Sequence, residues 1–281
     1  MRAHQARWFA FIAVVLAAAM TASADAPARD QPRRVVSMNV CTDQLAMLLA
    51  APGQLHSVSF LAADPTISAL AGEAEGFVLN HGLAEEIFLM QPDLILAGAY
   101  STRATTAMLR RLGFRVEVFE PERDFDGVRS NITRMGQLLG REDQARRMVA
   151  GIDVGLAELA RHAPSQKSVA LYYPNSFTAG SGTLVDAVIT AAGLHNLADD
   201  FGLTGTVRLP LEVLVMANPD LVVGGDRRHQ TPALAEQNLV HPAFRAFIAN
   251  HDQVTLPSRY TVCGAPFTVE AARTLQKAAE P

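Results

Sequence analysis

The sequence has 281 residues, 49% of them hydrophobic, which is enough for one large domain or for two lobes with separate cores. It carries 28 acidic and 24 basic residues, and this balance excludes a general nucleic-acid binder, which needs clustered positive charge. Only two lysines occur, Lys167 and Lys277, and neither follows a glycine-rich turn, which excludes a P-loop.

The first 24 residues predict a signal peptide. Arg2 and Arg7 give a basic start, residues 8–20 form an apolar run, and residues 22–24 have the small-x-small spacing of a cleavage site. The apolar run is too short to cross about 30 Å of hydrocarbon as an anchor. We expect cleavage near Ala24 or Ala26 and a mature protein in the periplasm, with 22 basic and 28 acidic residues and a net charge of −6.

Short apolar runs alternate with helical stretches in the first half of the chain. We predict strands at residues 34–38, 55–59, 94–97 and 116–119, a helix at 42–51 capped by Thr42 or Asp43, and a helix at 102–112 that ends at Gly113. Residues 125–162 then show only helical periodicity, interrupted at Gly140, and we expect one continuous helix at 141–162, about 33 Å long.

The alternation resumes after Pro164, with predicted strands at 169–173, 221–223 and 254–256 and a helix at 183–192. The pattern predicts an α/β protein with two Rossmann-like lobes, each built on a parallel sheet and joined by one long rigid helix. We expect a signal peptide at 1–24, an N-terminal lobe at 25–125, a helical spacer at 126–162 and a C-terminal lobe at 163–281.

A repeat supports two matched lobes. Residues 85–98 align without a gap on residues 212–225, each copy having a glutamate, an apolar stretch, Pro-Asp and a buried strand. Pro92 and Pro219 are expected to stop the helix before each strand. Glu85 and Glu212 occupy the same helix position in the two copies. This match predicts an acidic pair that suits a partner with paired arginines, although a solvated surface position for each glutamate is the simpler alternative.

The chain resembles the periplasmic substrate-binding proteins that feed iron-siderophore and cobalamin ABC importers. The matching stretches are residues 34–45, 85–98, 184–196 and 212–225, so the likeness spans most of the mature chain. The resemblance implies a class III binding-protein fold, a ligand held between the lobes, and docking of Glu85 and Glu212 on arginines of the inner-membrane permease, which works with an ATPase. We expect the long helix to resist bending, so that closure on the ligand is small. Glu86 is the alternative to Glu85 as the first docking residue.

Residues that follow the predicted strands are candidates for the ligand cleft, because ligands in α/β lobes bind beyond the carboxyl ends of the strands. The predicted cleft residues are Ser37, Asn39, Cys41, Phe60, Tyr100, Arg103, Tyr172, Tyr173, Asn175, Arg227, Arg228, His229, Arg259 and Tyr260. The four arginines predict a cationic rim for an anionic chelate, with a ferric siderophore as the first choice. Solvated arginines and packed tyrosines are the simpler alternatives.

Cobalamin and haem remain alternative ligands on the same scaffold. The only tryptophan is Trp8 in the leader, so no indole is available to stack on cobalamin, and haem would need an axial ligand such as Tyr100, His81 or His229. Bare zinc or manganese ranks lower because the histidines lack ligand spacing, and we expect no resident metal or cofactor. An exported α/β enzyme ranks lowest because Gly-x-Ser-x-Gly is missing, and we expect no catalytic residues and a monomer.

The two cysteines are predicted to be structural. Cys41 and Cys263 would lie in an oxidising compartment after export, so they are expected either to form a disulfide or to be two buried thiols. A contact with metal or ligand is the minor alternative.

Overall fold

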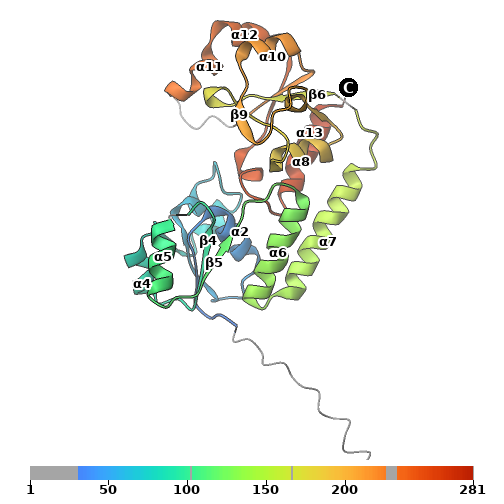
Figure 1. The fold of residues 1–281 in the computed structure, drawn as a ribbon. Helices are drawn as coiled ribbons and strands as arrows, with labels where there is room; N and C mark the ends of the chain where they lie inside the picture. The colour runs from blue at the N-terminus through green and yellow to red at the C-terminus, as the bar shows by residue number, and fades with distance from the viewer. Residues whose placement is uncertain (1–30, 102, 166, 226–232, 281) are drawn as a thin grey trace, which may run out of the picture. The chain divides into compact units, whose positions relative to one another are not determined.

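Two parallel β-sheets form the framework of the protein (Figure 1). The structure, a computed structural model, describes residues 31–101, 103–165, 167–225 and 233–280. The compact unit considered below begins at Pro32. The predicted signal peptide lies outside the described residues. Among those residues no helix is both long and apolar enough to cross a membrane.

The first sheet has five parallel strands in the order β3-β2-β1-β4-β5. They are β1 (Val35–Ser37), β2 (Leu55–Ser59), β3 (Val78–Asn80), β4 (Leu94–Gly98) and β5 (Val116–Phe119). The connections contain α2 (Val40–Leu49), η1 (Phe60–Ala63), α3 (Ala71–Ala74), α4 (Ala84–Met90) and α5 (Arg103–Arg111). The four predicted strands are confirmed. The short edge strand β3 was missed because its first two residues are exposed rather than part of a buried apolar run.

The second half of the chain contains a four-stranded parallel sheet in the order β11-β10-β6-β8. Its strands are β6 (Ser168–Leu171), β8 (His195–Asn196), β10 (Leu221–Gly224) and β11 (Asp252–Thr255), and a separate antiparallel pair consists of β7 (Phe177–Ala179) and β9 (Thr206–Arg208). The helices are η2 (Pro174–Ser176), α8 (Leu184–Ala191), α9 (Leu197–Asp200), α10 (Leu211–Ala217), η3 (Leu234–Glu236), α11 (Gln237–Val240), α12 (Pro242–Ile248), η4 (Ser258–Tyr260) and α13 (Thr268–Ala278).

Two antiparallel helices connect the sheets. They are α6 (Phe125–Leu139) and α7 (Glu142–Leu159), and the predicted interruption at Gly140 is confirmed, with Gly140 ending α6 in the left-handed conformation. The predicted helix at 141–162 is too long. The helix ends at Leu159, with Ala160 as its C-cap, so α7 has 18 residues and is about 27 Å long. The proposed lobe boundaries near residues 125 and 163 fall at the start of α6 and between α7 and β6.

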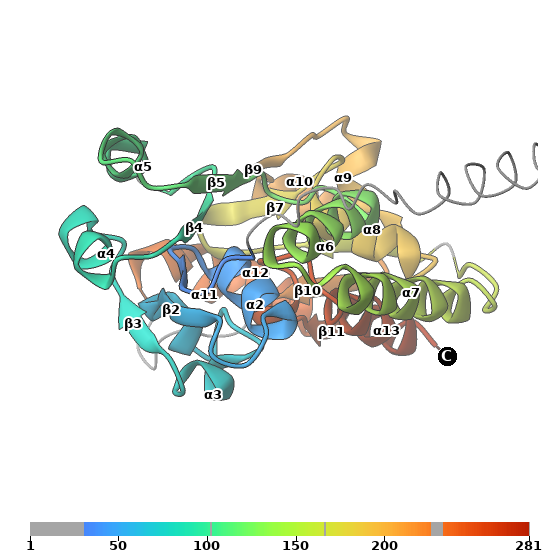
Figure 2. The same cartoon turned by 90° about the horizontal axis from the view of Figure 1, so that it is seen from below.

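Each sheet is covered by apolar side chains on both faces. In the first sheet, Val36 and Ile95 pack with residues of α4 and α5, whereas Val35 and Leu94 face the side of α2 and α6 (Figures 1 and 2). The latter side belongs to a core that continues through α6, α7 and α13 to β6 and β10. The helices between the sheets are therefore part of one packed core, which favours limited closure over a wide hinge motion.

The repeat seen in the sequence is also a structural repeat. Gln91 after α4 and Asn218 after α10 both end their helices in the left-handed region, with φ of 48°. The aspartate that follows each proline then accepts hydrogen bonds from the start of the neighbouring strand. Asp93 accepts from the backbone N–H groups of Arg33 and Arg34, and Asp220 accepts from the backbone N–H and hydroxyl of Ser168. The two copies therefore fix equivalent strand pairs, β1 with β4 and β6 with β10.

Candidate functional site

A cavity opens at the carboxyl ends of β1, β4 and β5. It has a volume of about 220 Å³, below the roughly 300–1,000 Å³ of typical ligand pockets, so it can hold only part of a large ligand. Its lining residues are Asn39, Val40, Cys41, Thr42, Leu45, Gly98, Ala99, Tyr100, Phe119, Glu120, Pro121, Glu122 and Val262. This is the sheet edge at which α/β lobes bind ligands.

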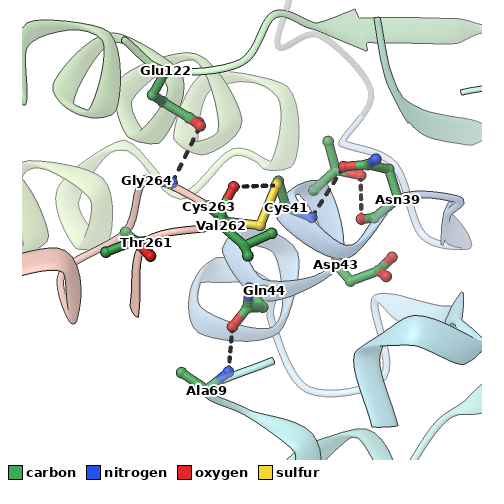
Figure 3. The surroundings of a disulfide bond; sticks show 12 residues. Asn39, Cys41, Asp43, Gln44, Ala69, Glu122, Thr261, Val262, Cys263 and Gly264 are labelled. Carbon is green, nitrogen blue, oxygen red and sulfur yellow. Dashed lines mark hydrogen bonds between the residues drawn. A yellow bond between two sulfur atoms is a disulfide. The ribbon is translucent and has the colours of Figure 1, made fainter. Parts of the chain in front are cut away.

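The wall of the cavity is held by a disulfide between Cys41 and Cys263, whose Cα atoms are 5.1 Å apart (Figure 3). The bond joins α2 to the segment between η4 and α13. Beside it, the Gly264 N–H donates to Oε2 of Glu122 over 3.2 Å. A Cβ atom at Gly264 would lie 2.5 Å from Cγ2 of Val128, so this close approach requires glycine. The disulfide and this hydrogen bond therefore attach the segment between η4 and α13 to the first lobe beside the cavity.

The first turn of α2 borders the cavity. Asn39 is the N-cap, because its Oδ1 accepts a hydrogen bond from the backbone N–H of Cys41 over 3.0 Å. The prediction that Thr42 or Asp43 caps this helix is therefore wrong: both are buried inside the first turn, and the hydroxyl of Thr42 hydrogen-bonds with that of Ser37 over 2.7 Å. Asn39 is thereby fixed at the edge of the cavity.

Asp43 is a buried carboxyl group just behind the site. Its Oδ2 accepts a hydrogen bond from the Ser59 hydroxyl, whereas its Oδ1 has no partner among the described residues. Burial raises the pKa of Asp43 from 3.8 to about 6, and the neighbouring Ser37 and Ser59 offset only part of this rise. The folded protein therefore holds this proton more tightly than the unfolded chain does.

This pKa shift predicts a loss of stability with rising pH. Because the folded-state pKa is raised, the stability difference develops between pH 4 and pH 6 and amounts to about 3 kcal/mol above pH 7. Asp43→Asn, which carries no charge, should be more stable than the wild type at pH 7.5 and should lose that advantage at pH 4. Urea unfolding at both pH values checks this, with exposed Glu75→Gln as the control. An equal wild-type and Asp43→Asn pH dependence would contradict the prediction.

A second group lies at the ends of β2 and β3. The rings of Phe60 and His81 stack with centroids 5.2 Å apart, and Nδ1 of His81 lies 3.1 Å from Oε1 of Glu86. Oε2 of Glu86 accepts a hydrogen bond from the His81 backbone N–H over 2.7 Å. These bonds hold the pKa of Glu86 below its usual value. Among the described residues, no three His, Cys, Asp or Glu side chains form a group that could hold a bare metal ion.

The predicted cleft residues fall into four groups. Asn39, Cys41 and Tyr100 line the cavity, and Phe60 lies on the same sheet edge. Ser37 and Tyr172 are buried and bonded internally, Tyr172 through Ser176 and a stacked Phe244, so the proposed site omits them. Arg227, Arg228 and His229 lie outside the described residues.

The other predicted cleft residues do not line the described cavity. Tyr173 is half-buried against Gly225, and burial raises its pKa to about 12. Asn175 and Arg103 are exposed, and the guanidinium of Arg259 lies over the ring of Tyr260 at 5.0 Å. Sequence reasoning missed Glu120, although it directly follows a predicted strand. Val262 does not directly follow a predicted strand, and it reaches the cavity through the disulfide of the neighbouring Cys263.

A periplasmic binding protein family model matches residues 35–260. A cobalamin-binding protein of Halobacterium salinarum is 29% identical over 218 residues, which are 76% of this chain and 59% of the relative, so the chain spans less than two thirds of that protein. The crystal structure of the periplasmic haem-binding protein HutB of Vibrio cholerae has a TM-score of 0.72 at 21% identity, covering 88% of this chain and 99% of HutB.

A possible iron-binding periplasmic solute-binding protein from Staphylococcus epidermidis has a TM-score of 0.71 at 18% identity, covering 89% of this chain and all of that chain. At these identities the two structures establish the fold, and the predicted α/β two-lobe architecture with parallel sheets is confirmed.

Proposed function

The chain belongs to the periplasmic binding protein family, and from this premise we propose that it captures a cobalamin-type corrinoid and delivers it to an ABC-type permease. It is a binding protein of the extracytoplasmic type rather than an enzyme, as the sequence predicted. We propose export by the predicted signal peptide and function as a monomer. The ligand is proposed to lie along the carboxyl ends of the first sheet, with the cavity holding one edge of it.

The charge of the cavity lining is the observation that favours a corrinoid over an anionic ligand. Its described lining includes Glu120 and Glu122 and contains no arginine, lysine or histidine. Glu122 is occupied by Asn131 and Gly264, whereas Glu120 is exposed and its carboxylate has no partner among the described residues. A free carboxylate accepts hydrogen bonds from amide N–H groups, which a corrinoid carries around its ring, and it repels anionic ligands.

A ferric siderophore stays the second candidate. That prediction depended on a cationic rim of Arg103, Arg227, Arg228 and Arg259. Arg103 and Arg259 lie outside the described lining, so nothing in it offsets the acidic residues. The carboxylates of an anionic siderophore or of haem would face Glu120 unfavourably. The curated relative described as cobalamin-binding supports the same order of candidates.

Equilibrium dialysis of the mature protein tests the choice of ligand. We expect cyanocobalamin to bind at least about tenfold more tightly than haemin or a ferric hydroxamate chelate, a difference of about 1.4 kcal/mol. Glu120→Ala should weaken cyanocobalamin by about tenfold, the value of one hydrogen bond to a charged group. Glu75→Ala, at an exposed acid outside the cavity lining, is the control. Preferred binding of haemin or the ferric chelate would overturn the corrinoid proposal.

We further propose that α4 and α10 dock on the permease. Glu85 and Glu212 are both exposed and have no partner among the described residues, whereas Glu86 is held by His81. Glu85 is therefore the better docking residue. One turn further along each helix, Leu89 and Met216 are 79% and 85% exposed. A carboxylate beside an exposed apolar side chain in each copy fits a partner that presents two equivalent arginine sites.

A further inference from the structure

The His81 side chain is oriented but not buried. Its Nδ1 faces Oε1 of Glu86 at 3.1 Å, its ring stacks on Phe60 with an angle of 23° between the ring planes, and 60% of the side chain is exposed. Phe60 is itself 47% exposed. Glu86 also accepts a hydrogen bond from the backbone N–H of His81, so this carboxylate holds both the backbone and the ring of His81.

This arrangement leaves the second ring nitrogen available. With Nδ1–H donating to a carboxylate, the neutral imidazole has its lone pair on Nε2, which makes no hydrogen bond to any described residue. A carboxylate behind Nδ1 is the usual support of a metal-ligating histidine, because it fixes the tautomer and the ring orientation. The stack on Phe60 restricts rotation of the ring further.

We propose that Nε2 of His81 ligates the metal at the centre of the bound macrocycle, with Glu86 and Phe60 positioning its ring. This rests on the proposed function and deepens it. One nitrogen cannot hold a bare ion, and no described group of three ligands exists to help it. It can complete the coordination of a metal that a macrocycle already holds. Haem and corrinoids both offer an exchangeable axial position, and the acidic cavity lining favours the corrinoid.

The ligand exchange is balanced without a redox step. The bond between cobalt and its axial water breaks, the lone pair of Nε2 forms the new bond, the water leaves, and the proton stays on Nδ1 beside Glu86. A ferric siderophore that supplies all six donors has no position to exchange. His81 follows β3 and is separated by β2 from the cavity at the ends of β1, β4 and β5, so the ligand must extend over two to four strand spacings of about 4.8 Å, as a substituted macrocycle does.

Absorption spectra of aquacobalamin and cyanocobalamin test the proposal on the mature protein. We expect the visible bands of aquacobalamin to shift on binding as imidazole replaces water, and we expect His81→Ala to abolish the shift and weaken binding by about tenfold or more. Glu86→Gln should retain the shift with roughly tenfold weaker binding. Cyanocobalamin, whose cyanide does not leave, should show no band shift with either the wild type or His81→Ala. His162→Ala, at an exposed histidine after α7, is the control.

The outcomes separate the two proposals. If cyanocobalamin binds but the aquacobalamin spectrum remains that of the water complex, or shifts equally in His81→Ala, the role of His81 is wrong and the proposed function stands. If neither corrinoid binds, both are wrong.

Discussion

The double substitution Glu85→Arg/Glu212→Arg should abolish ligand import while leaving ligand affinity in solution within about twofold of the wild type. Both carboxylates are exposed on helices outside the described cavity, so their removal changes no described ligand contact. Facing arginines on a permease, the new charges would convert two attractive pairs into repulsive ones, and like-charge contacts at an interface cost several kcal/mol. Import by reconstituted permease and ATPase, with dialysis of the same variant, measures both quantities.

The matched control carries the same change in net charge elsewhere. Glu75→Arg/Glu280→Arg also reverses two exposed acids, and it should import at the wild-type rate. The variant Leu89→Asp/Met216→Asp should lower import without affecting ligand binding, because it places charge where we propose apolar contact. Normal import by the Glu85/Glu212 variant, or a large loss of its ligand affinity, would contradict the docking role.

Removing the disulfide should lower the free energy of unfolding by about 2–5 kcal/mol. Cys41 and Cys263 are 222 residues apart, so the bond restricts a very long loop in the unfolded chain. Cys263 is buried, so alanine is the suitable replacement in Cys41→Ala/Cys263→Ala. Urea unfolding with and without reductant measures the effect.

The reductant provides the internal control for this prediction. It should destabilise the wild type to the level of the double variant and leave the variant unchanged. Because the bond also joins α2 to the segment carrying Val262, we expect the variant to bind ligand more weakly under native conditions. Equal stability of oxidised wild type and variant would contradict the structural role, and free thiols in the exported protein would contradict the bond itself.

The sequence predicted the framework well because its signals are local. Runs of buried apolar residues identified the central strands, and the repeat at 85–98 and 212–225 identified equivalent helices and strands in the two halves. The role of Asp93 and Asp220 was not predictable in the same way. Each ties its own strand to a partner about 50 to 60 residues away, and that contact depends on strand order.

The site was predicted less completely because it depends on side-chain direction and on distant contacts. The expected strand at 169–173 ends at Leu171, and Tyr172 packs into the core on Phe244 instead of facing a ligand. Glu120 could have been predicted as a cleft residue, because it directly follows a predicted strand and strand ends face the ligand. The pairing of His81 with Glu86 and the approach of Val262 through the disulfide required the folded arrangement.

Binding of cyanocobalamin to Ala99→Trp tests most directly whether the ligand lies at this sheet edge. Ala99 lines the cavity after β4, whereas Ala107 is exposed on the neighbouring helix α5. If the account is right, Ala107→Trp binds as the wild type does, and Ala99→Trp loses about tenfold or more in affinity because the indole occupies the space of the ligand. Undiminished binding by a folded Ala99→Trp protein would contradict the account.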